Sequence, residues 1–294
     1  MATTVGPAPG SAPWEAWPDC EHLTFTNPAG ETVELLMLAG AQGRLMPPVV
    51  NHTMPVPAQH GSRYLASAHK ERMVTVPTVF PGSITDRDEL RRWSRVLDPS
   101  KGEGTLAVVA GPHAGRTIRC VYDAGLDDLA EVYPGINEGT LLFRAAWPYW
   151  TDGQESSFDI AQGESATTWF PFLPLVLGAS DAFASFVIDN LGDVPAWPVV
   201  TVNGPGSQLT VENLTTAEGW TFSGDLVSGD VLTVDTRPGQ KTVVLNGSNA
   251  FPRLTVGSKL WPLVPGPNRV EVAMALTDPT ALVKFGWRNQ WLSA

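Results

Sequence analysis

Alternation of apolar and polar residues predicts short β-strands along most of this chain. In the first half, two alternating runs flank the turn Asn27-Pro28-Ala29-Gly30, a pattern typical of a β-hairpin. A second hairpin is expected around the turn at 111–115. The predicted strands of this half are 22–26, 32–37, 72–80, 104–109, 117–122 and 141–147. The first half is therefore predicted to be a mostly antiparallel β-domain.

One segment has a helical period instead. Thr85 can cap its start, with Asp88 at the capping-box position, and the apolar residues Leu90, Trp93 and Leu97 then share one face. Asp98-Pro99 ends the pattern. We expect one helix here, with its arginine-rich face in solvent rather than against a partner.

The second half repeats short strand patterns every eight to twelve residues, with no helical period between them. This spacing is typical of a β-sandwich with one buried face per sheet. The predicted strands are 185–189, 197–203, 208–213, 220–226, 231–236, 242–246, 269–276 and 282–288.

Changes in composition suggest the domain limits. Residues 1–18 are rich in Pro, Ala and Gly and are predicted to form an extended N-terminal arm, followed by a first domain at 19–150. A polar stretch at 151–164 is predicted as a linker, and 165–294 as the second domain. Within the first domain, 43–66 holds four prolines and no strand or helix period, so a long projecting loop is expected there.

Composition and charge exclude several classes of protein. The 294 residues include 28 Gly and 26 Pro, too many for an all-helical fold. The formal net charge of −11 argues against nucleic-acid binding as the main function. The start lacks a cationic and apolar signal sequence, and no run is long enough to span a membrane, so no membrane contact is expected. Cys20 and Cys120 are expected to be buried thiols rather than a disulfide.

A search for catalytic and ligand-binding motifs favours a protein that is not an enzyme. GxSxG, HExxH, Walker and GxGxxG motifs are absent, and the histidines, including His52 and His60 in the proline-rich loop, have no metal-ligand spacing. No cofactor or metal is therefore expected, and a glycoside hydrolase is disfavoured because no acid pair stands out. Exposed tryptophans could stack on a sugar, although Trp within strands is more often core; the three in question are Trp197, Trp220 and Trp261.

Several motifs in order resemble one known family. The second half contains GDVLTVDTRPGQKTVVLNGSNAF followed by KLWPLVPGPNRVEV, and it opens with NLGDVPAWPVV. The segment Arg144–Trp150 and the end at Trp287-Arg288 and Trp291 fit the same family. The chain is similar, from about residue 20 onward, to the distal tail proteins of phages with long, flexible tails.

The resemblance implies a structural virion protein at the tail tip, assembled in the host cytoplasm. Its fold would be all-β with one helix, in two β-sandwich-like domains of which the second is galectin-like. Six copies would form a ring that joins the tail tube protein to the tail-tip hub protein or baseplate, with the tape-measure protein as a further possible neighbour. DNA would pass through the ring without specific binding.

The proline-rich loop is the expected contact between neighbouring copies, because prolines lower the entropy cost of ordering a long arm. The candidate interface residues are Met46, Pro47, Pro48, Val49, Met54, Pro55, Pro57 and Tyr64. The alternative hypothesis is a carbohydrate-binding protein that recognises host-surface glycan through Trp197, Trp220 and Trp261 of the second domain.

Overall fold

A computed structural model describes residues 22–81, 87–111, 113–128, 130–133, 136–161, 181–275 and 280–294. The chain divides into two compact units. The first contains the described residues up to Gly153 together with Trp291–Ala294, and the second contains the described part of Gln154–Gln290. The predicted extended arm at 1–18 and residues 162–164 of the predicted linker lie outside the described residues.

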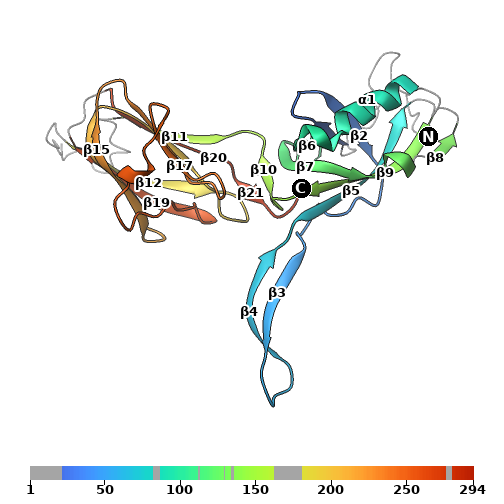
Figure 1. Cartoon of the computed structure of the whole chain (residues 1–294), viewed down its shortest axis with the longest axis horizontal. Coiled ribbons are helices and arrows are strands. Elements are labelled where there is room, and N and C mark those ends of the chain that lie inside the picture. Colours follow the sequence, from blue (N-terminus) through green and yellow to red (C-terminus); the bar gives the residue numbers. More distant parts are fainter. Residues whose placement is uncertain are drawn as a thin grey trace, which may run out of the picture. The chain divides into compact units, whose positions relative to one another are not determined.

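The first unit is built on a closed β-barrel (Figure 1). Its strands are paired in the order β7-β6-β1-β2-β5-β9, and pairing of β7 with β9 at Tyr122 and Phe143 closes the ring. The bounds are β1 His22–Thr26, β2 Thr32–Met37, β5 Arg72–Pro81, β6 Gly104–Val108, β7 Arg116–Ala124 and β9 Ile136–Ala145. The prediction of a sandwich for this domain is therefore wrong. The strands and both hairpins were predicted, but the long-range β7–β9 pairing leaves no local pattern in the sequence.

Shorter elements flank the barrel. Strand β8 (Ala130–Tyr133) adds to β9, while β10 (Trp150–Asp152) and β21 (Gln290–Trp291) extend the sheet beyond β7. Two 3₁₀ turns, η2 (Pro99–Lys101) and η3 (Leu126–Asp128), connect the strands.

The barrel core follows the alternation read from the sequence. Alternate residues of the first hairpin are buried, among them Leu23, Phe25, Val33 and Leu35. Cys120 is also buried and forms no disulfide.

Helix α1 (Arg87–Leu97) covers part of this barrel. Its residues Trp93, Val96 and Leu97 are all nearly inaccessible, and the Trp93 ring lies 4.5 Å from that of Phe80. The predicted apolar face of the helix therefore does reach the core. Its predicted capping residue, Thr85, lies outside the described residues.

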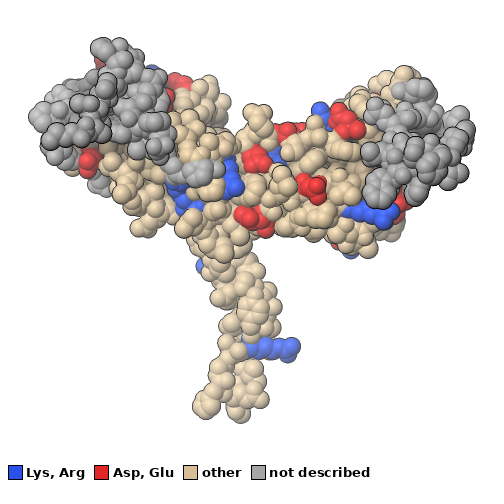
Figure 2. Space-filling view, turned by 180° about the vertical axis from the view of Figure 1, so that it is seen from behind, with Lys and Arg blue, Asp and Glu red and all other residues tan. Residues whose placement is uncertain are grey.

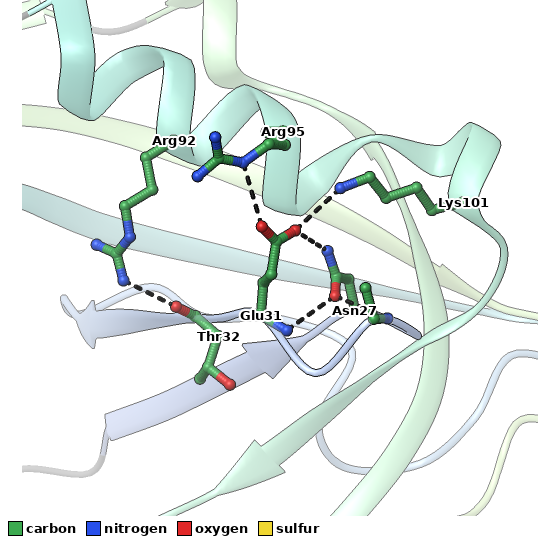
Figure 3. A network of polar contacts seen from close by, with 7 residues as sticks. Asn27, Glu31, Thr32, Arg92, Arg95 and Lys101 are labelled. Carbon is green, nitrogen blue, oxygen red and sulfur yellow. Dashed lines mark hydrogen bonds and ion pairs between the residues drawn. The ribbon is translucent and has the colours of Figure 1, made fainter.

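A polar network on the other side of α1 ties the helix to the first hairpin (Figure 3). The Glu31 carboxylate accepts hydrogen bonds from Asn27 Nδ2 at 2.9 Å and Lys101 Nζ at 3.0 Å, and lies 3.2 Å from Arg95 Nε. Arg92 donates to the carbonyl oxygen of Thr32 at 3.0 Å. The hydrogen bonds from Asn27 and Lys101 lower the pKa of Glu31. Part of the arginine-rich face thus binds the turn between β1 and β2.

The second unit has the two packed sheets expected of a sandwich. One sheet has the order β11-β20-β13-β16-β17-β18 and the other β12-β19-β14-β15. Residues of both sheets, such as Val200 and Phe285 of the first and Val211 and Val272 of the second, belong to one core. The galectin likeness of this unit stays a prediction.

The strands of the second unit include all eight that the sequence predicted. The six-stranded sheet contains β11 Ser156–Ala161, β13 Val199–Asn203, β16 Val231–Asp235, β17 Thr242–Leu245, β18 Ser248–Asn249 and β20 Leu282–Trp287. The four-stranded sheet contains β12 Asp181–Asn190, β14 Gly206–Asn213, β15 Glu218–Leu226 and β19 Gly266–Ala275, and a 3₁₀ turn, η4, spans Phe251–Arg253. Strands β10 and β11 occupy much of the segment predicted as a linker. The C-terminal residues 291–294, predicted in the second domain, lie in the first unit.

Asparagines from the sequence motifs satisfy buried main-chain groups here. Asn268, fully buried, donates to the carbonyl oxygens of Val264 and Gly266 at 2.7 and 2.9 Å and accepts from Asn213 Nδ2. Asn190 donates to the carbonyl oxygens of Val194 and Leu263 at 3.0 and 2.9 Å. These motif residues therefore stabilise turns, because buried polar main-chain groups need partners.

The GD…LNG motif fixes another turn in the same way. Asn246 Nδ2 donates to Asp230 Oδ1 at 2.6 Å, and each side chain also accepts from a main-chain N–H, of Val231 and Val227 respectively. These hydrogen bonds lower the pKa of Asp230.

Among the described residues, no helix is both long and apolar enough to cross a bilayer.

Candidate assembly interface

A two-stranded β-hairpin projects from the barrel of the first unit (Figure 1). Strands β3 (Val49–Pro55) and β4 (Ser62–His69) pair antiparallel, from Val49 opposite His69 to Pro55 opposite Ser62. In the described structure these two strands pair only with each other. We call residues 45–69 the arm; this name does not refer to the predicted N-terminal arm at 1–18.

The sequence predicted a loop for this region, and the structure corrects that to a hairpin. All but two of the fifteen strand residues are exposed, Val50 and His69 being half-buried. Strand alternation in a sequence reflects one buried face, and a strand exposed on both faces leaves no such pattern. The exposed state of the arm explains the failed prediction.

The arm presents apolar side chains to solvent. Seven of the eight predicted interface residues are exposed: Met46, Pro48, Val49, Met54, Pro55, Pro57 and Tyr64. Pro47, the eighth, is buried. Leu45 and Leu65, which the sequence reasoning missed, are 73% and 55% exposed. The sequence did offer a signal for both residues: each is apolar and lies in a long segment that has no strand or helix period.

The arm is also nearly free of formal charge. Arg63 is the single Lys, Arg, Asp or Glu in the sequence from 45 to 69, and Figure 2 shows the projecting arm almost wholly in tan. Depletion of charge together with exposed apolar and aromatic residues is the composition of an interface core.

Polar contacts between side chains stiffen the hairpin. Ser67 Oγ donates to Asn51 Oδ1 at 2.5 Å across the strands, and the hydroxyl groups of Tyr64 and Ser67 are 2.8 Å apart. At the inner end, Lys70 N donates to the carbonyl oxygen of Pro48 at 2.8 Å.

Buried groups hold the root of the arm. Arg72, fully buried, donates from Nη1 to the carbonyl oxygen of Gly43 at 2.9 Å and from Nη2 to that of Leu292 at 2.7 Å. Burial lowers the pKa of Arg72 to about 10. Gly43 has φ +76°, and a Cβ there would lie 1.9 Å from the carbonyl oxygen of Met73. The chain leaves the barrel at this point through a conformation that requires glycine.

The C-terminal residues complete the root. Arg116 donates to the carbonyl oxygen of Ser293 at 2.7 Å and lies 4.0 Å from the ring centroid of Trp291. Trp291 Nε1 in turn donates to Asp152 Oδ1 at 2.7 Å. Ala294 N donates to the carbonyl oxygen of Arg44 at 2.9 Å.

An aromatic group from the Arg144–Trp150 motif lies beside the last arm residue. The hydroxyl of Tyr149 is 2.8 Å from His69 Nδ1, and the Tyr149 ring contacts that of Trp147 edge to face. Burial raises the pKa of the Tyr149 hydroxyl. This motif therefore supports the arm as well as the barrel, where Trp150 is fully buried.

The three tryptophans of the carbohydrate hypothesis have different environments. Trp220 and Trp261 are each 1% exposed and belong to the sandwich core. A glycan cannot reach them, so their assignment as glycan-facing residues is wrong. Trp197 is half-buried and lines a surface pocket.

Metal coordination finds no support in the described part of the chain. There, no group of three His, Cys, Asp or Glu could hold an ion. His52 and His60 both lie exposed on the arm.

One family model matches part of the second unit. Residues 191–291 match the family described as "Siphovirus-type tail component, C-terminal domain". No curated protein sequence matches the chain.

One solved structure shares the fold of most of the chain. The crystal structure of the SPP1 Dit protein (gp 19.1), described as a paradigm of the hub adsorption apparatus of phages that infect Gram-positive bacteria, is 14% identical. It covers 91% of this chain and 98% of its own, with a TM-score of 0.64, which shows a common fold. The activated baseplate of phage P2 with Ca contains a chain 10% identical, with coverages of 90% and 97% and a TM-score of 0.43.

Proposed function

We propose that this chain is a distal tail protein that forms a homo-hexameric ring. The match of residues 191–291 to the siphovirus-type tail component family supports this proposal. The ring connects the tail tube protein to the tail-tip hub or baseplate of the virion and lets DNA pass. The family is one of structural tail components, not of enzymes.

The exposed arm is the main observation in support of ring formation. A two-stranded hairpin alone in water is marginally stable at best, and this one has no described sheet partner and exposes Met46, Met54, Tyr64 and Leu65. Contact with a surface that covers these side chains would stabilise it by removing apolar area from water, at about 25 cal/mol per Å².

We assign that surface to a neighbouring copy of the same chain. An arm that binds a different patch on the next copy makes a head-to-tail contact, and such contacts close into rings when the rotation permits. The root of the arm supports this role, since the hydrogen bond from Arg72 to the carbonyl oxygen of Gly43 and the positive φ of Gly43 set the direction in which the arm leaves the barrel. The number six rests on the resemblance to distal tail proteins.

Removal of the arm tests the proposal. The hydrogen bond from Lys70 N to the carbonyl oxygen of Pro48 lies at the base of the hairpin, beside the pair Val49 and His69. Val49–His69 can therefore be replaced by Asn-Gly, the preferred two-residue hairpin turn. We expect a folded monomer by light scattering and circular dichroism, against sixfold rings of the unaltered chain in negative stain. Rings formed without the arm would contradict its role.

A milder variant separates interface from stability. Changing Leu45, Met46, Tyr64 and Leu65 to Ser should abolish the ring and leave thermal unfolding unchanged. The matched control changes Leu191 and Val227 to Ser, which are 70% and 63% exposed in the second unit, and should retain the ring.

A monomeric unaltered chain with saturable glycan binding would favour the carbohydrate hypothesis instead.

Charge supports passage of DNA without binding. The chain has 30 acidic and 19 basic side chains, and phosphate groups are repelled by a net negative surface. An electrophoretic mobility assay at low salt should show no shift of duplex DNA. A dissociation constant in the micromolar range or below would contradict this part of the proposal.

A further inference from the structure

A pocket of about 520 Å³ opens on the sandwich of the second unit. Its lining combines one half-buried tryptophan with charged, hydroxyl and apolar groups: Trp197, Glu218, Lys241, Thr255, Lys259 and Pro262. This volume is in the range of small-molecule sites.

Main-chain hydrogen bonds hold the walls of this pocket in place. Ala196 and Leu263 exchange hydrogen bonds of 2.9 and 2.7 Å, which position the adjoining Trp197 and Pro262. Elsewhere in the lining, Thr255 N and Lys259 N donate to the carbonyl oxygens of Thr221 and Gly219 at 2.9 and 2.8 Å. A pocket with fixed walls loses little conformational entropy when a ligand binds.

The pocket is locally cationic within an acidic unit. Residues 154–290 contain seven Lys and Arg against thirteen Asp and Glu, yet the pocket has two lysines and one glutamate. Glu218 lies 3.4 Å from Lys259. Lys241 has neutral neighbours, the carbonyl oxygen of Leu260 at 3.4 Å and the Trp197 ring, whose centroid is 5.5 Å from Nζ. The Lys241 ammonium is therefore available to an anion.

We propose that this pocket binds a pyranose sugar that carries an acidic group, either a carboxylate or a phosphate. The C–H face of the sugar lies against the Trp197 indole, which offers a large, rigid apolar surface. The acidic group lies toward Lys241, as a charge-assisted hydrogen bond requires. Glu218 and Thr255 bind the sugar hydroxyls.

Saturation-transfer NMR of the full chain tests this proposal with glucuronic acid, glucose 6-phosphate and glucose. At a sugar concentration of about 10 mM, we expect saturation transfer to the ring protons of at least one acidic sugar and weaker transfer to those of glucose. Which acidic sugar responds identifies the anionic group.

Two variants and a control make the test specific to the pocket. Lys241→Gln should raise the dissociation constant of the acidic sugar about tenfold, and Trp197→Ala should abolish transfer. Lys284→Gln, an exposed position on β20, should change neither. Deletion of the arm should leave sugar binding intact, so the proposed sugar site and the proposed ring are tested independently.

Either of two results would overturn the site. One is the absence of transfer to both acidic sugars. The other is transfer that is equal for glucose and the acidic sugars and unchanged by Lys241→Gln.

Discussion

The guanidinium of Arg72 donates a hydrogen bond of 2.7 Å to the carbonyl oxygen of Leu292, 220 residues further along the chain. Its other terminal nitrogen binds Gly43, where the chain turns toward the arm. One buried side chain thus joins the start of β5, the root of the arm and the C-terminal segment of the first unit. Along the sequence, the second unit lies between Gly153 and Trp291 of the first, and the hydrogen bond from Arg72 holds the segment that follows it.

Replacement of Arg72 by Met should destabilise the first unit by about 2–4 kcal/mol, because the carbonyl oxygens of Gly43 and Leu292 lose the charged donor that this buried side chain supplies. Removing a buried charge offsets part of this loss. Urea unfolding followed by circular dichroism measures the change. Arg91→Met is the control, since that side chain is 77% exposed; an equal effect of both substitutions would show that the buried hydrogen bonds contribute nothing.

Trp220→Ala should destabilise the second unit by about 3–5 kcal/mol, because it leaves a large cavity in the sandwich core. Trp197→Ala, at the half-buried pocket wall, should cost about 1 kcal/mol or less. Differential scanning calorimetry distinguishes the two. A Trp220→Ala protein as stable as the unaltered chain would contradict the burial of this residue.

Glu31→Gln should weaken the chain at neutral pH and have little effect in acid. The pKa of Glu31 is lowered in the folded state from its ordinary value of 4.5. The ionised carboxylate therefore stabilises the fold above about pH 4.5, and this contribution is lost as pH falls through the lowered pKa. The difference in Tm between the unaltered chain and the variant should be larger at pH 7 than at pH 3.

Glu34→Gln provides the control on the same hairpin, at an exposed position of β2. Comparison with it separates loss of the polar network from loss of one negative charge. A constant difference for Glu31→Gln across the acid range would rule out the network in Figure 3 as its cause.

The Cys120 thiol should be unreactive in the folded protein. Burial raises its pKa to about 12, so roughly a thousandfold less thiolate is present at pH 8 than for a free cysteine. In a Cys20→Ser background, Ellman's reagent should react only after addition of denaturant. Prompt reaction without denaturant would show that β7 opens readily.

Local patterns determined much of the fold, for a physical reason. The alternation at Val270, Val272 and Met274 predicts β19 because one face of that strand is buried in the core. The same logic predicted the first hairpin and the apolar face of α1. It failed for the arm, where both faces are exposed, and it could not separate a buried Trp220 from a half-buried Trp197, since both adjoin strands.

The sequence by itself determined a β-rich chain with one helix, an acidic balance, a proline-rich segment in the first half and an ordered set of tail-component motifs. Only the tertiary structure decided that β7 and β9 close a barrel, that the proline-rich segment is a hairpin, and that residues 291–294 return to the first unit. The physical reason is distance along the chain. Periodicity records whether a residue faces a core, whereas pairing between remote segments depends on which surfaces the folded elements bring together.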